Sequence, residues 1–83
     1  MAFYAYMLRC ADDTIYSGYT NDIERRVEVH NSGAGAKYTR ARRPVTLVYF
    51  ESFETKNEAM KREAQFKKLT RAQKNDMISS FKG

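Results

Sequence analysis

The chain has 83 residues, 42% of them hydrophobic and eleven aromatic, which suffices for one modest core and leaves no room for two domains. Its single cysteine, Cys10, excludes an internal disulfide and a cysteine-based metal site. A lone thiol is typical of a reducing compartment. No long apolar run or cleavage pattern opens the sequence, which argues against a signal peptide and a membrane span. We therefore expect one domain over residues 1–83, located in the cytoplasm.

The net charge of +5 is distributed unevenly along the chain. Residues 29–50 contain no Asp or Glu but four basic side chains, Lys37, Arg40, Arg42 and Arg43. A patch of one sign attracts polyanions and accelerates encounter with them. A solvated basic surface is the alternative, and the patch alone does not decide between the two.

Residues 3–10 and 14–19 are predicted to form a β-hairpin. The first segment is nearly continuous in apolar and aromatic residues, as in a central strand buried on both faces. If three residues form the turn, Tyr6 lies opposite Gly18 and diagonal to Tyr16 on the same face, with about 7–8 Å between the two tyrosine backbones. A turn of two residues would put the tyrosines on opposite faces, and tyrosines that simply pack are the alternative. Gly18 would leave open space beside Tyr6.

Helical spacing and capping residues predict the remaining elements. In chain order these are a helix from residue 21 to 33, a basic loop over 32–44, a strand over 45–53, a helix over 55–69 and a short helix from 70 onward. Asn21 begins the first helix with Glu24 at the capping-box position, and Gly33 ends it. Two further capping boxes lie at 55–58 and 70–73. The fold is predicted to be α/β (α+β), a small three-stranded antiparallel sheet flanked by helices in the order β-β-α-β-α-α.

Arg26 and His30 lie on or beside the apolar face of the first helix. Steps of about 100° per residue put His30 on the buried arc with Ile23, Val27 and Val29, and put Arg26 between His30 and Val29. A guanidinium at the edge of an apolar face either extends outward to solvent or holds an anion. We expect His30 to be a core or supporting histidine rather than a catalyst.

Glu63 falls within the apolar face of the second long helix. That face consists of Ala59, Met60, Phe66 and Leu69. A carboxylate in such a position is costly unless it is paired or bound to a metal. A salt bridge to one of the many basic residues is the alternative.

Together these residues resemble the GIY-YIG nuclease superfamily. Tyr4-Ala5-Tyr6 and Tyr16-Ser17-Gly18 are similar to the two tripeptides that name the family, with ten residues from Tyr6 to Tyr16. Arg26 matches the family arginine, and Glu63 matches its metal-binding glutamate. Residues 32–40 resemble the short stand-alone bacterial branch, whose substrates are poorly defined.

Three positions differ from the pattern of the family. Tyr4 stands where the family name has Gly, and Ser17 stands where it has Ile. Both tyrosines of the motif are retained, so no reacting group is lost, although Tyr4 could alter the approach of the backbone near the site. Tyr19 stands where some relatives have a lysine that assists the base, so that assistance is missing or comes from elsewhere.

The resemblance implies a metal-dependent endonuclease. One divalent cation, Mg²⁺ as the first choice and Mn²⁺ as the second, would be bound by Glu63. Arg26 would balance the charge on the phosphate. Tyr16 or Tyr6 would be the base, with Tyr16 ranked slightly first. A neutral phenol with a pKa of about 10 is a weak base, so a cation must lower that pKa or the phenol must pass its proton on.

The partner implied by the resemblance is nucleic acid, with DNA favoured over RNA and with cleavage selected by structure or strand rather than by sequence, as in DNA repair or recombination. The residues expected to bind it are Lys37, Tyr38, Arg40, Arg42 and Arg43. The basic ones would contact phosphates, and Tyr38 would stack on an exposed base. Those expected to support the site are Gly18, Tyr19 and His30.

Two other functions remain open at this point. A catalytically idle nucleic-acid-binding module of the same fold would need the basic loop just as much. An interaction domain for another polyanion is the more remote alternative. A protein partner or a homodimer is also left open by the sequence.

Overall fold

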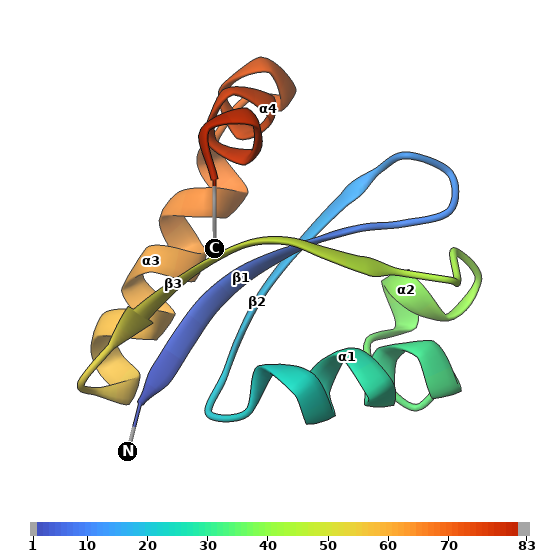
Figure 1. The fold of residues 1–83 in the computed structure, drawn as a ribbon, viewed down its shortest axis with the longest axis horizontal. Coiled ribbons are helices and arrows are strands. Elements are labelled where there is room, and N and C mark those ends of the chain that lie inside the picture. The colour runs from blue at the N-terminus through green and yellow to red at the C-terminus, as the bar shows by residue number, and fades with distance from the viewer. Residues whose placement is uncertain (1, 82–83) are drawn as a thin grey trace.

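In the computed structural model, which describes residues 2–81, three antiparallel strands form a sheet in the order β2-β1-β3. Helices α1 and α2 lie on one side of the strands and helices α3 and α4 on the other (Figure 1). The elements are β1 (Phe3–Arg9), β2 (Ile15–Thr20), α1 (Ile23–Ser32), α2 (Lys37–Arg40), β3 (Thr46–Phe53), α3 (Lys56–Lys68) and α4 (Arg71–Ser80). The predicted α+β fold is confirmed. Within residues 2–81, no helix is long and apolar enough to cross a membrane.

Helix α2 is the one element that the sequence did not predict. It is a single turn within the predicted basic loop. The segment Lys37–Arg40 lies between Gly35 and Pro44 and contains no helix-breaking residue. This turn makes the observed order β-β-α-α-β-α-α.

A turn of three residues fixes the register of the β1–β2 hairpin. Asp13, the last residue of the turn, has a left-handed φ of 69°, as is common in three-residue hairpin loops and tolerated by Asp. Tyr6 lies opposite Gly18, as predicted. Tyr6 and Tyr16 therefore share one face of the sheet.

Strand β1 is buried on both faces and divides the core into two layers. Tyr6 and Leu8 belong to the layer on the α1 side. Ala5 and Met7 belong to the other layer, where they pack with Phe66 of α3. Burial on both faces explains why the β1 sequence is almost continuously apolar.

Helix α1 begins one residue later than predicted. Its N-cap is Asp22 rather than Asn21, because the Asp22 carboxylate accepts a hydrogen bond from the backbone N–H of Arg25. A carboxylate at this position also interacts favourably with the positive end of the helix dipole. Glu24 then lies in the first turn rather than at the capping-box position. Gly33 ends the helix with a φ of 89°, as predicted.

The two C-terminal helices begin at the predicted threonines. At α4, Thr70 and Gln73 form the complete capping box. At α3, Thr55 accepts a hydrogen bond from the Glu58 backbone, but its hydroxyl also donates to the Glu58 carboxylate at 2.9 Å. Glu58 therefore bonds the Thr55 side chain instead of closing the predicted box on the Thr55 backbone.

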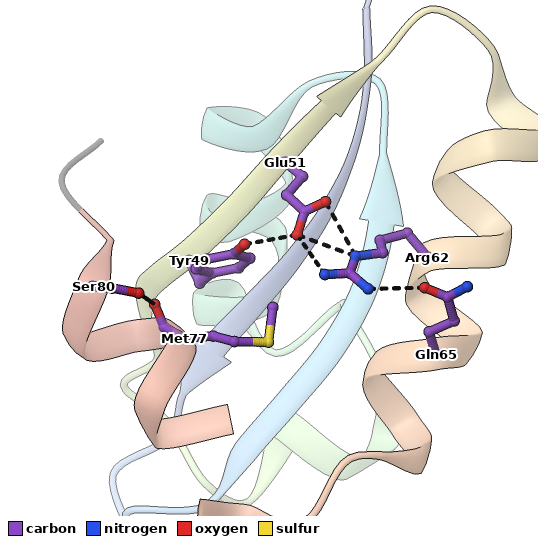
Figure 2. Close-up of polar contacts among 6 residues, drawn as sticks. All are labelled: Tyr49, Glu51, Arg62, Gln65, Met77 and Ser80. Carbon is purple, nitrogen blue, oxygen red and sulfur yellow. Dashed lines mark hydrogen bonds and ion pairs between the residues drawn. The ribbon is translucent and has the colours of Figure 1, made fainter. Parts of the chain in front are cut away.

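A bidentate ion pair attaches α3 to β3. The Arg62 guanidinium donates to both carboxylate oxygens of Glu51 at 3.0–3.1 Å (Figure 2). The Tyr49 hydroxyl donates to the same carboxylate at 2.7 Å, and Gln65 accepts from Arg62 at 2.8 Å. Only 27% of the Glu51 side chain and 31% of the Arg62 side chain are exposed, so water screens this pair less than it screens an open surface pair.

We predict that Glu51→Gln lowers the free energy of unfolding by about 1 kcal/mol, because a neutral amide accepts the Arg62 fork less strongly. Urea unfolding measures the change. The matched control is Glu54→Gln, at an exposed position just before α3. Equal losses in the two variants would show that the Arg62 pair contributes nothing specific.

Candidate active site

A hollow of about 340 Å³ beside the edge strand β2 collects the four residues that the sequence singled out. They come from four different elements, β1, β2, α1 and α3, and are Tyr6, Tyr16, Arg26 and Glu63. Gly18, Tyr19 and Thr20 of β2 complete the lining. Side chains far apart in the chain thus reach one concave surface.

The Tyr6 phenol lies directly over Gly18. A Cβ atom at Gly18 would be 2.5 Å from Tyr6 Oη and 2.6 Å from Tyr6 Cζ. The expectation of open space beside Tyr6 is therefore wrong, because the phenol itself fills that space. Tyr6 is only 2% exposed, so its ring has little freedom to move away. Glycine is needed here for close approach.

A chain of hydrogen bonds behind Tyr6 fixes the tautomer of His30. The Thr39 hydroxyl donates to the Ala36 carbonyl oxygen at 3.0 Å. Its oxygen therefore accepts from His30 Nδ1–H, at 2.8 Å. A neutral imidazole has only one N–H, so His30 Nε2 is an acceptor and receives the phenolic O–H of Tyr6 at 3.1 Å.

The pKa values of Tyr6 and His30 agree with this arrangement. Burial raises the pKa of Tyr6, and the nearby Arg26, whose Nε donates to Tyr6 Oη at 3.4 Å, offsets part of that rise. Burial, followed by the charge of Arg26, lowers the pKa of His30. At neutral pH the proton therefore rests on Tyr6, and His30 is uncharged.

Glu63 lines the hollow and is also paired. Its Oε1 lies 3.4 Å from Lys67 Nζ, one turn further along α3. This is the salt bridge that the sequence left open as an alternative. Lys67 is 57% exposed, so the pair contributes little to stability. The 19% exposed Glu63 carboxylate thus faces the hollow with a weakly held counterion.

The oxygen donors of the hollow fit a hard divalent cation. Among residues 2–81, no group of three or more His, Cys, Asp or Glu side chains is placed to hold a metal ion. Mg²⁺ retains several waters and is often bound by one or two carboxylates together with substrate phosphates. Glu63 suits that chemistry, whereas the closed sets of nitrogen and sulfur ligands that hold structural zinc do not form here.

The arginines of the basic loop bind the protein backbone. A guanidinium N–H of each donates to a carbonyl oxygen at 2.8–3.2 Å in Arg40, Arg42 and Arg43. Arg42 also pairs with Asp12 at 3.0 Å. A guanidinium has five N–H donors, so each arginine retains donors for a phosphate while it stabilises the loop. The Lys37 side chain is exposed and forms no hydrogen bond or ion pair with the rest of residues 2–81.

Tyr38 connects the loop to the hollow. Its ring stacks on Tyr16, with 5.9 Å between centroids and 28° between planes. The Arg42 guanidinium lies 4.0 Å from the centroid of the same ring. A base could stack on that side of Tyr38 only after Arg42 moved away. The Tyr16 ring in turn lies edge-on to His30 at 5.2 Å.

Two residues that hold His30 were not recognised in the sequence. Thr39 is completely buried and accepts from the imidazole. Gly35 lies so close that a Cβ there would be 2.5 Å from His30 Nδ1 and 2.9 Å from its Cα. Both belong to the loop and α2, where the sequence showed only a Gly/Ala-rich basic stretch. Their role becomes visible only when the loop folds back on α1.

Tyr4 lies outside the hollow, although it belongs to the first tripeptide. Its ring packs edge-on against Phe50 at 5.8 Å and lines a larger hollow of about 370 Å³. That hollow, beside the start of α1, contains none of the four convergent residues. Tyr4 in place of Gly therefore does not narrow the candidate site.

The chain is similar to known proteins over most of its length. The GIY-YIG catalytic domain matches residues 2–76. The chain belongs to the GIY-YIG family. It is 58% identical over 77 residues to UPF0213 protein CPE1444 of Clostridium perfringens, an alignment that covers 93% of this chain and 83% of that protein. It is also 58% identical over 75 residues to UPF0213 protein VNG_2274C of Halobacterium salinarum, covering 90% of this chain and 97% of the relative.

Two solution NMR structures have the same fold. Protein EF2693 from E. faecalis superposes with a TM-score of 0.64 at 53% identity, covering 98% of this chain and 86% of that one. UPF0213 protein BH0048 from Bacillus halodurans superposes with a TM-score of 0.60 at 47% identity, covering 95% and 84%. The chain is thus a small GIY-YIG protein related to the UPF0213 proteins, and its family implies nuclease-type activity on nucleic acid.

We predict that Gly18→Ala lowers the free energy of unfolding by about 1–3 kcal/mol, because the new methyl group overlaps the buried Tyr6 phenol. The same substitution should weaken the Tyr6–His30 hydrogen bond and shift the imidazole signals in NMR spectra. The control is Ser17→Ala, since the buried Ser17 hydroxyl has no hydrogen-bond partner among residues 2–81 and its removal should leave stability unchanged or raise it. Unchanged stability in Gly18→Ala would show that Tyr6 repacks freely.

A second prediction concerns the titration of His30, the only histidine in the chain. Because its folded pKa is lowered, the stability that neutral His30 contributes is fully present above about pH 6.5 and is lost as the pH falls through the folded pKa. NMR titration of the imidazole should give a midpoint below about 6.5. The loss of stability on acidification should be smaller in His30→Gln. A midpoint at or above 6.5 would contradict the assigned environment.

Proposed function

We propose that this GIY-YIG protein is a metal-dependent endonuclease that hydrolyses phosphodiester bonds, with DNA as the first candidate substrate. The observation that carries the proposal is the convergence in one hollow of two phenols, a guanidinium and a carboxylate, from Tyr6, Tyr16, Arg26 and Glu63. The surrounding basic residues are suited to phosphates, and contacts to phosphates carry no sequence information. This supports selection by structure or strand over selection by sequence.

The hydrogen bonds favour Tyr6 as the group that accepts the proton of the attacking water. Its own proton is directed at His30 Nε2, so that proton can pass to the imidazole as the water proton arrives at Tyr6 Oη. Arg26 lies beside the phenolic oxygen and stabilises negative charge there. This reverses the order expected from the sequence, which ranked Tyr16 first. Tyr16, held between His30 and Tyr38, would position the phosphate or the water.

Arg26 and Glu63 would bind opposite charges in the same hollow. Glu63 pairs with Lys67 and not with Arg26, so the guanidinium is available for non-bridging phosphate oxygens. Glu63 would hold a divalent cation, Mg²⁺ first, which when bound polarises the phosphate and neutralises charge on the leaving oxygen. Arg26 and the cation held by Glu63 would thus share the negative charge of the transition state between them.

The test is a cleavage assay on single-stranded, duplex and branched DNA and on RNA, with Mg²⁺, Mn²⁺ or EDTA. Glu63→Gln and Tyr6→Phe should each lower the rate by about 100-fold or more, and Tyr16→Phe should have a smaller effect. The matched controls are Glu51→Gln, a carboxylate on the other sheet face, and Tyr4→Phe, a phenol in the other hollow. Both should retain the wild-type rate.

Three outcomes would count against this function. Cleavage that survives Glu63→Gln and Tyr6→Phe would show that the reaction does not take place in this hollow. Salt-sensitive binding without any metal-dependent cleavage would favour the idle nucleic-acid-binding module. Full activity in EDTA would contradict the role of a metal.

A further inference from the structure

Two further hollows continue the candidate active site along the free edge of β2. One, of about 280 Å³, is lined by Ile15, Tyr16, Ser17, Tyr38, Lys67 and Lys74. The other, of about 230 Å³, is lined by Thr14, Ile15, Tyr38, Arg71 and Lys74. They share Ile15, Tyr38 and Lys74, and the first shares Tyr16 with the active-site hollow. We call these two hollows together the β2 groove.

The β2 groove is lined by basic side chains of the C-terminal helices and by Tyr38 of the basic loop. Lys67, Arg71 and Lys74 come from α3 and α4, a region with seven basic and three acidic residues between 56 and 80. Tyr38 of α2, with the Arg42 guanidinium over its ring, forms the opposite wall. The basic loop and the C-terminal helices thus meet across β2.

The individual contacts identify the cations that a ligand could use. Arg71 is occupied, since it donates to the backbone and the carboxylate of Asp13 at 2.6 and 2.9 Å. The Lys74 ammonium group has no hydrogen bond or ion pair with other residues between 2 and 81, although the residue is only partly exposed. Lys67 holds Glu63 loosely at 3.4 Å, in a pair that a stronger anion could replace.

Ser17 provides an independent observation at the same place. It is 4% exposed and lines the β2 groove, yet its hydroxyl has no hydrogen-bond partner among residues 2–81. An unpaired buried hydroxyl costs about 1–3 kcal/mol. The oxygen is covered in this conformation, so the side chain would have to shift before an anion beside Lys67 and Lys74 could accept from it.

The dimensions and continuity of the groove select the class of ligand. From Ile15 to Tyr19 the strand extends roughly 13 Å, about the rise of four nucleotides along one strand of B-DNA. Lys67 lies in the groove and touches Glu63 in the active-site hollow. A ligand that fills the β2 groove and the active-site hollow must therefore carry a series of negative charges past the reacting centre. A nucleic-acid strand does this, and a single small anion does not.

We propose that the β2 groove binds the phosphate backbone of the substrate strand next to the bond that is cut, with Lys67 and Lys74 contacting phosphates. The proposal rests on the proposed nuclease function and assigns a subsite to residues of the C-terminal helices. The basic loop grips the strand from one wall, and α3 and α4 grip it from the other.

The test measures binding of a fluorescent single-stranded oligonucleotide in EDTA by anisotropy, as a function of salt. Each phosphate contact contributes about 0.7 to the slope of log K against log salt for a single strand, so Lys67→Gln/Lys74→Gln should reduce the slope by about 1.4. The matched control is Lys61→Gln/Lys68→Gln, which removes the same charge from exposed positions of α3 that do not line the groove. Lys74→Gln alone, which leaves the Glu63 pair intact, should reduce the slope by about 0.7.

Equal slope changes in the two double variants, or none in either, would overturn the proposal. Urea unfolding of each variant confirms that the fold is retained. Because binding is measured without metal, its result does not depend on whether the protein cleaves nucleic acid. If the protein binds through Lys67 and Lys74 but never cleaves, the groove proposal is supported and the nuclease function is contradicted. If Lys67→Gln/Lys74→Gln binds and cleaves like the wild type, the nuclease function is supported and the groove proposal is contradicted.

Discussion

The hydrogen bond between the Tyr6 phenol and His30 Nε2 is the contact on which the rest of the site depends. It joins the central strand to α1, and it exists only because neighbouring positions leave room for it. Gly18 admits the phenol on one side, and Gly35 admits the imidazole on the other. Thr39 then fixes which ring nitrogen carries the proton. A loop that the sequence marks mainly by its charge therefore also sets the protonation of the buried pair.

How much of this could be predicted depends on the range of the interactions involved. The hairpin register follows from the length of its turn, and the side-chain period of two then puts Tyr6 and Tyr16 on one face. The helical period likewise puts Glu63 on the sheet side of α3. These are local rules, and the comparison with relatives confirms the family that the motif residues indicate.

The parts that could not be predicted depend on contacts between distant segments, or on a choice between neighbouring residues that could each fill the same role. The space beside Gly18 is filled by a side chain from another strand. The cap of α1 is decided between Asn21 and Asp22 by which side chain reaches the helix N–H groups. Lys67 and Lys74 are ordinary basic residues in their helices, and only the packing of α3 and α4 on the sheet brings both to the same groove.

The position of β2 at the edge of the sheet has a consequence for the behaviour of the protein in concentrated solution. A strand with unpaired backbone groups along one side invites another chain to add to the sheet, and natural proteins commonly guard such edges with lysines. Here Lys67 and Lys74 stand beside the open side of β2. A second copy of the chain would bring the same ammonium groups into mutual repulsion. The charges suited to a polyanion therefore also oppose self-association through this edge.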